Sequence, residues 1–389
     1  MSSKAEWSGV PDGIKSKVYR IRDLDMHVLE AGTTSHPLIL LLHGFPELSF
    51  SWRKIILPLV GAGYHVVAPD QRGFGETKST NDGDKPLRFE DDVAPYRMTN
   101  LVHDIVALVF GLGHTSAATV VGHDFGSAVA AYCALIRPDL FKSAVCMSAP
   151  FTGPPPLPFD VAKHGSAPPQ SRLNLLGAVT QILGRLSPPM KHYMSYFSGP
   201  TANDDMLNAP QGVTAFLRAY FHMKSGDWPA NDPHPLGSAA ELTLLPAYYI
   251  MPKDLTMPEA VVQHAPVEAD ITPNHWLPSP ELEVYVEEYK RTGFQGGLNW
   301  YRASTDPVFS DCLSLYHGRR IDVPFMFIGG AKDWGVYQMP GGVEKMKASC
   351  PRMHEEDFVL IEGAGHWVQQ ERPHEVLAHI FHFLQKVNK

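Results

Sequence analysis

The sequence predicts an α/β protein, with a mostly parallel, doubly wound sheet and an inserted, mainly helical cap. In the first and last parts of the chain, short apolar runs alternate with segments of helical spacing, and this alternation is typical of a parallel sheet. Between these parts the prolines concentrate, with 21 of the 34 lying from Pro150 to Pro280, and proline interrupts regular helices and strands. We therefore expect a core in residues 1–150 and 306–389 and a cap in residues 151–305.

The first part of the core begins with a hairpin. Residues 17–32 alternate between apolar and polar side chains, which predicts two strands with one buried face. Residues 37–42 (PLILLL) form a continuous apolar run, which predicts a strand buried on both faces. The patterns that follow predict, in chain order, a helix at 51–60, a strand at 64–68, a helix at 98–112, a strand at 118–121, a helix at 125–136 and a strand at 144–147.

The last part of the core contains two similar strand-to-loop segments. Residues 323–333 (VPFMFIGGAKD) and 356–367 (EDFVLIEGAGHW) each place an apolar run before a polar, glycine-containing loop. A final amphipathic helix is expected at 375–386. In parallel sheets, binding and catalytic residues lie at the edge formed by the carboxyl ends of the strands. These two loops are therefore candidates for carrying functional residues.

Composition excludes several classes of protein. The chain has 33 basic and 41 acidic residues, a formal charge of −8, which disfavours a nucleic-acid partner because phosphate neutralisation needs basic residues. No apolar run approaches the roughly 18 residues of a membrane span. The polar N-terminus lacks a signal-peptide pattern, and four scattered cysteines without CxxC spacing indicate neither a disulfide framework nor a zinc site. We expect a cytoplasmic protein, and its oligomeric state stays open.

The most informative motif is VVGHDFGS, which places Asp124 between a strand and a helix, flanked by Gly122 and Gly126. Glycines around a sharp strand-to-helix turn are typical of a nucleophile elbow, which raises one side chain above the sheet. Ester hydrolases place serine there. A helix-capping aspartate is the structural alternative, so the assignment depends on partner residues elsewhere in the chain.

Two partners follow in the expected order. Asp333 and His366 each end one of the C-terminal strands, and the order nucleophile, acid, histidine is the one found with a nucleophile elbow. The loop after the PLILLL strand, His43-Gly44-Phe45-Pro46, stands where such folds supply an oxyanion hole. We expect the backbone N–H groups of Phe45 and Phe125 to form it.

Together, the segments HGFPE, DQRGFGET, GHDFGS, GGAKDW and EGAGHW resemble the α/β-hydrolase superfamily, and the aspartate nucleophile resembles its epoxide hydrolase branch. The cap also carries a resemblance. Residues 289–302 (YKRTGFQGGLNWYR) resemble the stretch of soluble epoxide hydrolases that supplies one cap tyrosine, which here is Tyr301. Residues 193–197 (YMSYF) resemble the other, with Tyr196 the better match and Tyr193, Tyr248 and Tyr249 as alternatives.

The resemblance implies hydrolysis of an epoxide to a vicinal diol without cofactor or metal. Asp124 would form a covalent ester, the cap tyrosines would polarise the epoxide oxygen, and His366 with Asp333 would activate water. His43, Pro46 and Trp367 are expected to contact a small hydrophobic epoxide, the only partner besides water that the sequence implies.

Three alternatives share part of this logic. A haloalkane or haloacetate dehalogenase uses an aspartate nucleophile too, but Phe45 and Phe125 offer no side-chain donor for a halide and no arginine follows Asp124 closely. A tailoring enzyme of secondary metabolism could open an epoxide within a larger molecule, and sequence does not separate it from a detoxifying enzyme. A binding protein without activity is disfavoured by the intact Asp124, Asp333 and His366.

Overall fold

Nine strands form the central sheet of the computed structural model, which describes residues 7–387 except 82, 84 and 158–174. The order is β1-β2-β4-β3-β6-β7-β10-β11, and β5 pairs with β2. All neighbours from β4 to β11 run parallel, whereas β1, β2 and β5 pair antiparallel. The predicted mostly parallel sheet is confirmed. The strands are β1 (Lys15–Ile21), β2 (Leu24–Ala31), β3 (Leu38–Leu42), β4 (His65–Pro69), β5 (Lys78–Ser79), β6 (Ala117–His123), β7 (Ala144–Met147), β10 (Phe325–Gly330) and β11 (Phe358–Ile361).

Helices cover both faces of this sheet. Along β3, Leu38, Leu40 and Leu42 enter one apolar core, with helices α2 and α3, whereas Ile39 and Leu41 enter a second core with α1 and α15. Successive strand side chains point to opposite faces, so the continuous apolar run is explained by burial on both sides. The core helices are α1 (Ile56–Gly61), α2 (Met98–Gly111), α3 (Phe125–Ile136), α13 (Gly342–Ser349), α14 (Val368–Glu371) and α15 (Pro373–Val387).

One predicted core helix is wrong in its extent. Instead of a helix at 51–60, the chain forms a short 3-10 helix, η1 (Ser49–Trp52), and then α1 (Ile56–Gly61). Pro58 lacks a backbone N–H and fits only the first turn of a helix, so the helix begins two residues before it. Other 3-10 helices of the chain are η2 (Ala94–Tyr96), η3 (Ala239–Leu244), η4 (Asp311–Tyr316), η5 (Trp334–Val336) and η6 (Glu355–Asp357).

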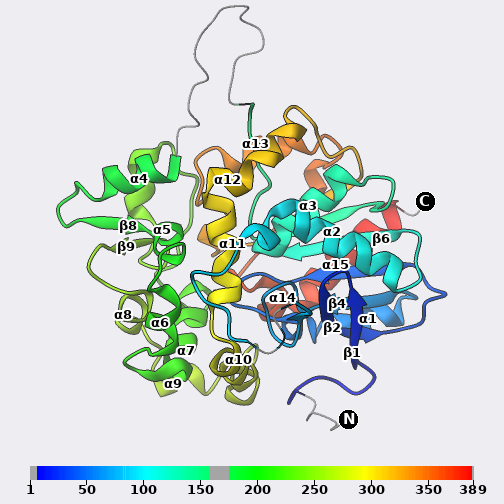
Figure 1. The fold of residues 1–389 in the computed structure, drawn as a ribbon, viewed down its shortest axis with the longest axis horizontal. Helices are drawn as coiled ribbons and strands as arrows, with labels where there is room; N and C mark the ends of the chain where they lie inside the picture. The colour runs from blue at the N-terminus through cyan, green and yellow to red at the C-terminus, as the bar shows by residue number, and fades with distance from the viewer. Residues whose placement is uncertain (1–6, 82, 84, 158–174, 388–389) are drawn as a thin grey trace, which may run out of the picture.

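Between β7 and β10 the chain builds a separate layer beside the sheet's carboxyl edge (Figure 1). Residues 158–174 of the predicted cap lie outside the described part. The rest is mainly helical, with one small antiparallel pair of strands, β8 (Met190–His192) and β9 (Ile250–Pro252). Its helices are α4 (Leu175–Leu183), α5 (Tyr193–Phe197), α6 (Ala202–Leu207), α7 (Gly212–Lys224), α8 (Met257–Val262), α9 (Glu268–Ile271), α10 (Ser279–Thr292), α11 (Gln295–Thr305) and α12 (Pro307–Ser310).

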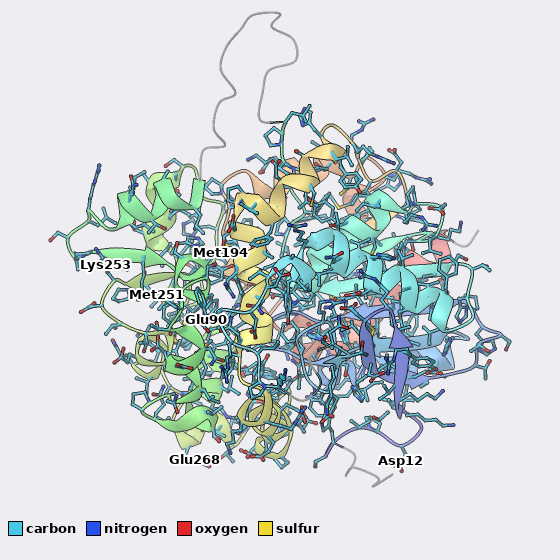
Figure 2. The ribbon with its side chains drawn as sticks, viewed as in Figure 1. Asp12, Glu90, Met194, Met251, Lys253 and Glu268 are labelled. Atoms are coloured by element: carbon cyan, nitrogen blue, oxygen red, sulfur yellow. The ribbon has the colours of Figure 1, made fainter. Side chains whose placement is uncertain are left out.

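Helix α11 lies on the side of this layer that faces the core (Figure 1). Gly296 and Gly297 make the approach possible, because a Cβ on Gly296 would lie 1.9 Å from the carbonyl oxygen of Gly73 and one on Gly297 would lie 2.6 Å from the Phe45 ring. The side chain of Trp300 donates to the Arg72 carbonyl at 2.9 Å. Figure 2 shows the exposed Lys253 of the cap far from Asp12, which lies at the opposite end of the molecule. Within the described residues, no helix is long and apolar enough to cross a membrane.

Candidate active site

Asp124 sits at a strained turn between β6 and α3. Its φ of 54° and ψ of −120° are unusual for a residue with a side chain. The flanking glycines permit the turn, since a Cβ on Gly122 would lie 2.0 Å from the Gly126 carbonyl oxygen and one on Gly126 would lie 2.2 Å from the Leu42 carbonyl oxygen. The backbone therefore has the elbow geometry that the motif predicts.

The Asp124 carboxylate is held from two sides. Its Oδ1 accepts a hydrogen bond from the Phe45 backbone N–H at 3.0 Å, and its Oδ2 lies 3.3 Å from His366 Nε2. Gly44 lets the loop come this close, because a Cβ there would lie 2.4 Å from Asp124 Cβ. Burial opposes ionisation, but the hydrogen bond and charge of His366, followed by the Lys224 charge, lower the pKa of Asp124 below its ordinary value. The carboxylate is thus ionised at neutral pH.

His366 bridges the two carboxylates of the site. Its Nδ1 lies 3.1 Å from Asp333 Oδ1, while its Nε2 faces Asp124. Asp333 also accepts the Gly335 N–H at 2.7 Å. Although burial opposes ionisation, the charge and hydrogen bond of His366 lower the pKa of Asp333. The three residues predicted from separate motifs therefore lie together at the carboxyl ends of β6, β10 and β11, with a hydrogen bond between His366 and Asp333 and a 3.3 Å contact between His366 Nε2 and Asp124 Oδ2.

A buried network that the sequence analysis did not identify supports the His366 backbone. The carbonyl of His366 accepts hydrogen bonds from Ser148 Oγ at 2.8 Å and His123 Nε2 at 2.6 Å. His123 Nδ1 in turn lies 2.6 Å from Glu47 Oε2. Burial disfavours the charged imidazole, but the Glu47 charge raises the pKa of His123 above its ordinary value. His123 lies inside the GHDFGS motif and Glu47 inside the HGFPE motif. Their places in these motifs are the sequence feature from which a role beside the site could have been predicted.

Glu371 also holds the histidine loop, and it ties this loop to the cap. Its carboxylate accepts three backbone N–H bonds, from Gly226 at 2.8 Å, Gly365 at 2.9 Å and Trp367 at 3.0 Å. Gly226 follows α7 in the cap, whereas Gly365 and Trp367 flank His366. Burial raises the pKa of Glu371 to about 7, against the effect of these bonds. Nothing in the sequence predicts that Glu371 accepts these three bonds, because a glutamate in a helix is ordinarily exposed.

Tyr301 projects from α11 over the elbow. Its ring contacts Phe125 and Phe45 edge-on, with centroid distances of 4.8 and 5.6 Å. Its hydroxyl forms no hydrogen bond with any residue that the structure describes. Burial, and then the negative charge of Asp124, raise the pKa of Tyr301 well above its usual range. Tyr301 therefore keeps its proton beside the carboxylate.

The structure separates the candidates for a second tyrosine. The hydroxyl of Tyr196 donates to Asp205 Oδ2 at 3.0 Å, within the cap. Tyr193 instead packs against Tyr301, with ring centroids 6.0 Å apart, and donates to Gln338 Oε1 at 3.2 Å. Burial and then the Asp124 charge raise the pKa of Tyr193. The Tyr196 hydroxyl is thus turned to Asp205 within the cap. The alternative, Tyr193, lies beside Tyr301 and within the electrostatic reach of Asp124.

The remaining alternatives line the same side of the cap. Tyr248 donates to Asn231 at 2.7 Å, whereas Tyr249 contacts Tyr193 with ring centroids 5.1 Å apart. For both, burial and then the charge of Asp333 raise the pKa. Neither packs on Tyr301 as Tyr193 does, so Tyr193 is the favoured alternative.

The three residues predicted to contact substrate, His43, Pro46 and Trp367, differ in whether their side chains already have hydrogen-bond partners. His43 donates from Nδ1 to the Gly44 carbonyl and accepts the Gln71 N–H at Nε2, so its ring holds the loop and has no free nitrogen. Pro46 is buried in the same loop. Trp367 is fully buried, and its Nε1 donates to the Phe221 carbonyl at 2.8 Å. These residues are placed to shape the site, with hydrogen-bonding groups already engaged.

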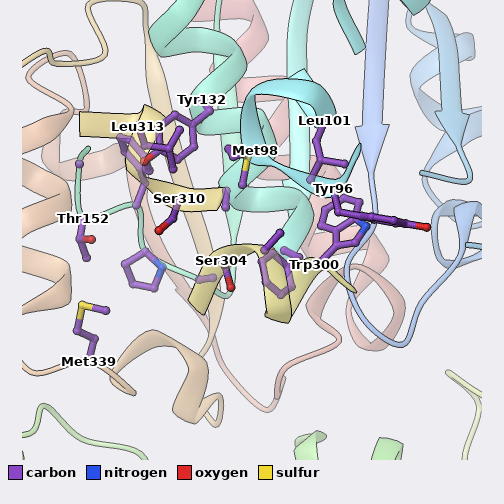
Figure 3. A pocket seen from close by; sticks show the side chains of 17 residues that line it. Tyr96, Met98, Leu101, Tyr132, Thr152, Trp300, Ser304, Ser310, Leu313 and Met339 are labelled. Carbon is purple, nitrogen blue, oxygen red and sulfur yellow. The ribbon is translucent and has the colours of Figure 1, made fainter. Parts of the chain in front are cut away.

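A cavity of about 340 Å³, lined by side chains that include Met98, Tyr132 and Trp300 (Figure 3), reaches Phe125, the residue after Asp124. Phe125 and Trp300 form the wall that it shares with the site, and Met98, Leu101 and Tyr132 line it further out. Asp124, His366 and Tyr301 are not among its lining residues. The cavity is therefore an apolar neighbour of the Asp124 site, and Asp124, Asp333 and His366 do not line it.

A nucleophile elbow, a strand-end acid and a strand-end histidine on a mostly parallel sheet define the α/β-hydrolase class. In agreement, residues 37–178 match the sequence profile of the family described as alpha/beta hydrolase fold. Two curated relatives cover nearly the whole chain. Epoxide hydrolase A of Mycobacterium tuberculosis is 33% identical over 92% of this chain and 94% of the relative, and epoxide hydrolase 2 of Siraitia grosvenorii is 30% identical over 93% and 96%.

Solved structures agree with this placement. Potato (Solanum tuberosum) epoxide hydrolase I superposes with a TM-score of 0.71 at 30% identity, covering 96% of this chain and 99% of that one. Epoxide hydrolase A of Mycobacterium thermoresistibile gives a TM-score of 0.72 at 30% identity, covering 96% and 98%. The chain belongs to the epoxide hydrolase family of α/β-hydrolases, and it is a hydrolase.

Proposed function

We propose that this protein hydrolyses epoxides to vicinal diols through a covalent ester of Asp124. The observation that carries the proposal is the arrangement around that residue. The Phe45 N–H holds Oδ1 of its carboxylate, and Oδ2 faces His366. The buried Tyr301, whose ring packs on Phe45 and Phe125, lies within the electrostatic reach of the same carboxylate. A carboxylate attacks carbon without prior deprotonation, because it is ionised at neutral pH. The two curated relatives described above, both named epoxide hydrolases, support the same reaction class.

In the first step, Asp124 attacks one epoxide carbon from the side opposite the oxygen. The carbon–oxygen bond of the epoxide breaks, and the new bond joins the carbon to a carboxylate oxygen of Asp124. The released alkoxide takes a proton from a tyrosine hydroxyl. Tyr301 suits this role because its hydroxyl is buried, protonated and free of other hydrogen bonds to the described residues.

For the second donor we propose Tyr193 in place of the sequence-favoured Tyr196. The Tyr196 hydroxyl is engaged by Asp205, and Asp124 is not among the charges that affect it most. Tyr193 packs against Tyr301 and is affected by the Asp124 charge. Its bond to Gln338 would be exchanged for one to the epoxide oxygen.

In the second step, water hydrolyses the ester. His366 Nε2 accepts a proton from the water, whose oxygen attacks the carbonyl carbon of the Asp124 ester, and Asp333 stabilises the resulting imidazolium through Nδ1. The tetrahedral oxyanion is stabilised by the backbone N–H groups of Phe45 and Phe125. When this intermediate collapses, the bond between the diol oxygen and the Asp124 carbonyl carbon breaks, and the imidazolium of His366 gives its proton to the leaving oxygen. The proton left on the Asp124 carboxyl returns to the tyrosinate, which restores the starting state of the site.

A single turnover in water enriched in heavy oxygen tests this mechanism. With excess enzyme and styrene oxide, the diol is expected to carry unlabelled oxygen from Asp124, while the label appears in the enzyme. Direct appearance of the label in the first diol would refute the covalent route. Halide release from a short bromoalkane or from bromoacetate, with no diol from any epoxide, would instead assign the protein to the dehalogenases.

A further inference from the structure

The last residue of α7, Lys224, is buried, and none of the described residues gives it a carboxylate partner. Only 3% of its surface is exposed. Within the described part of the chain, its ammonium group forms neither a hydrogen bond nor an ion pair, although an ammonium has three N–H donors. Buried lysines are ordinarily paired, because removing a charge from water is costly. The proposed reaction has no step that involves Lys224, so the mechanism does not explain why this lysine is buried.

Four aromatic rings surround the Lys224 ammonium. Its Nζ lies 5.4 Å from the ring centroid of Tyr220, 5.3 Å from those of Tyr249 and Trp367, and 6.0 Å from that of Tyr248. Aromatic faces attract a cation at these distances, which keeps the charged form tolerable without using its N–H donors in strong hydrogen bonds. The rings therefore hold a cation whose donors remain available.

This aromatic cage is continuous with the Asp124 site. The Lys224 carbonyl accepts the His366 backbone N–H at 2.8 Å, and Trp367 packs against His366 with ring centroids 4.6 Å apart. On the other side, Tyr249 contacts Tyr193. Burial lowers the pKa of Lys224, whereas the charges of Asp124, Asp333 and Glu47 oppose this lowering. The ammonium thus stands within the electrostatic reach of the catalytic carboxylates without pairing with either.

A purely structural role does not account for these features. A lysine in the last turn of a helix interacts favourably with the helix dipole, but that effect operates at the surface and needs no burial. Packing of the four rings would be served equally well by methionine, which has no charge to desolvate. An unpaired buried cation beside a reaction centre is typical of a group that binds a ligand.

We propose that Lys224 binds an anionic group of the substrate, so that the natural substrates are epoxides bearing a carboxylate near the ring. This inference rests on the proposed function and narrows its substrate class. A carboxylate accepts the ammonium's N–H bonds, and the positive charge offsets the repulsion that Asp124 and Asp333 would exert on an acid. The aromatic walls suit an apolar body next to that group, so the expected hydrophobic epoxide becomes an amphiphilic epoxy acid.

A matched pair of substrates tests the proposal. The acid 3-phenyloxirane-2-carboxylate and its neutral primary amide differ only in charge, and kcat/KM is measured for both with wild type and with Lys224→Met. Wild type is expected to favour the acid by about tenfold or more, and the variant to reduce this acid-to-amide ratio by about tenfold or more, mainly through KM of the acid. Lys253→Met, an exposed lysine on the outer cap, makes the same change in net charge and should leave the ratio unchanged.

The outcomes separate this inference from the proposed function. Hydrolysis of both compounds by wild type without preference for the acid, or an unchanged ratio in Lys224→Met, would overturn the anion site while leaving epoxide hydrolysis intact. Hydrolysis of neither these nor simpler epoxides would overturn the proposed function itself.

Wild type alone provides a second measurement, which applies if the variant does not fold. Phenylacetate should inhibit hydrolysis of styrene oxide about tenfold more strongly than phenylacetamide does, because only the former carries the anion. Equal or weaker inhibition by phenylacetate would contradict the proposal.

Discussion

The core and cap sides of the site are organised in different ways. On the core side, each catalytic group is held by directed hydrogen bonds: Asp124 by the Phe45 N–H, and His366 by Asp333 through its ring and by Ser148 and His123 through its carbonyl. On the cap side, the groups are held chiefly by aromatic contacts. The hydroxyl of Tyr301 has no hydrogen bond to a described residue, whereas the hydroxyls of Tyr193, Tyr196 and Tyr248 donate to groups outside the Asp124 site.

This difference indicates a division of tasks. A fixed network keeps the proposed nucleophile and the proposed base within reaction distance and does not depend on the substrate. Aromatic walls and one unpaired cation, Lys224, distinguish between substrates by shape and charge. Changes to the core side should therefore affect reaction steps, and changes to the cap side should affect which molecules react and how well the epoxide oxygen is polarised.

The largest effect is expected from removing the nucleophile. Asp124→Ala should lower the diol formation rate by about four orders of magnitude or more, because no other described carboxylate occupies the elbow. Initial rates with styrene oxide measure this, and thermal unfolding checks that the variant is folded. Retention of a tenth of the activity or more would place the nucleophile elsewhere.

Removing the base should stop the second step and spare the first. With His366→Gln, turnover should fall by about three orders of magnitude, while Asp124 still reacts and the ester accumulates. Mass spectrometry of the intact protein should then show an increase equal to the mass of the substrate. The double variant with Asp124→Ala is the control, and an adduct on that protein would show that the modified residue is not Asp124.

Glu371, which connects the two regions, gives a prediction on stability. Burial raises its pKa to about 7 in the folded protein, above the ordinary glutamate value near 4.5, so folding favours the protonated form. Its stabilising contribution is therefore full below pH 4.5 and is lost as the pH rises towards 7, by up to about 3 kcal/mol. Urea unfolding from pH 5 to pH 8 should show wild type losing stability relative to Glu371→Gln. Parallel curves for the two proteins would contradict this.

Most of the core could be predicted from sequence for a physical reason. A strand buried on both faces, such as β3, must be continuously apolar, and a turn as tight as the one at Asp124 requires glycine at 122 and 126. These demands are local, so they leave a local pattern. The same holds for Asp333 and His366, which end strands of one parallel sheet and therefore meet at its edge.

The cap could be predicted only in outline. Its helices are short, and α5 has five residues, so periodicity does not show which of its tyrosines faces the core. Tyr193 and Tyr196 differ by less than one helical turn, and long-range contacts with Tyr301 and Asp205 decide between them. Lys224 could not be identified for a similar reason, because three of its four surrounding rings, those of Tyr248, Tyr249 and Trp367, are distant from it in sequence.

Tyr301→Phe tests the cap side of the mechanism. It removes a proton donor for the epoxide oxygen and should slow formation of the Asp124 ester by about ten- to hundredfold. Pre-steady-state burst kinetics measure this step separately from hydrolysis of the ester. The packing of the ring on Phe125 and Phe45 is retained in the variant, so an unchanged rate of ester formation would remove Tyr301 from the reaction.

The smallest effect distinguishes the two neighbouring tyrosines of α5. Tyr196→Phe removes the hydrogen bond to Asp205 and should lower the free energy of unfolding by about 1 kcal/mol, with a smaller effect on ester formation than Tyr193→Phe has. The two variants lose the same atom from residues three apart, so they serve as matched controls for each other. Urea unfolding gives the stability term, and burst kinetics give the rate. If Tyr196→Phe slowed ester formation as much as Tyr301→Phe, the tyrosine favoured by sequence would be the second donor, and the bond to Asp205 would have to break when substrate binds.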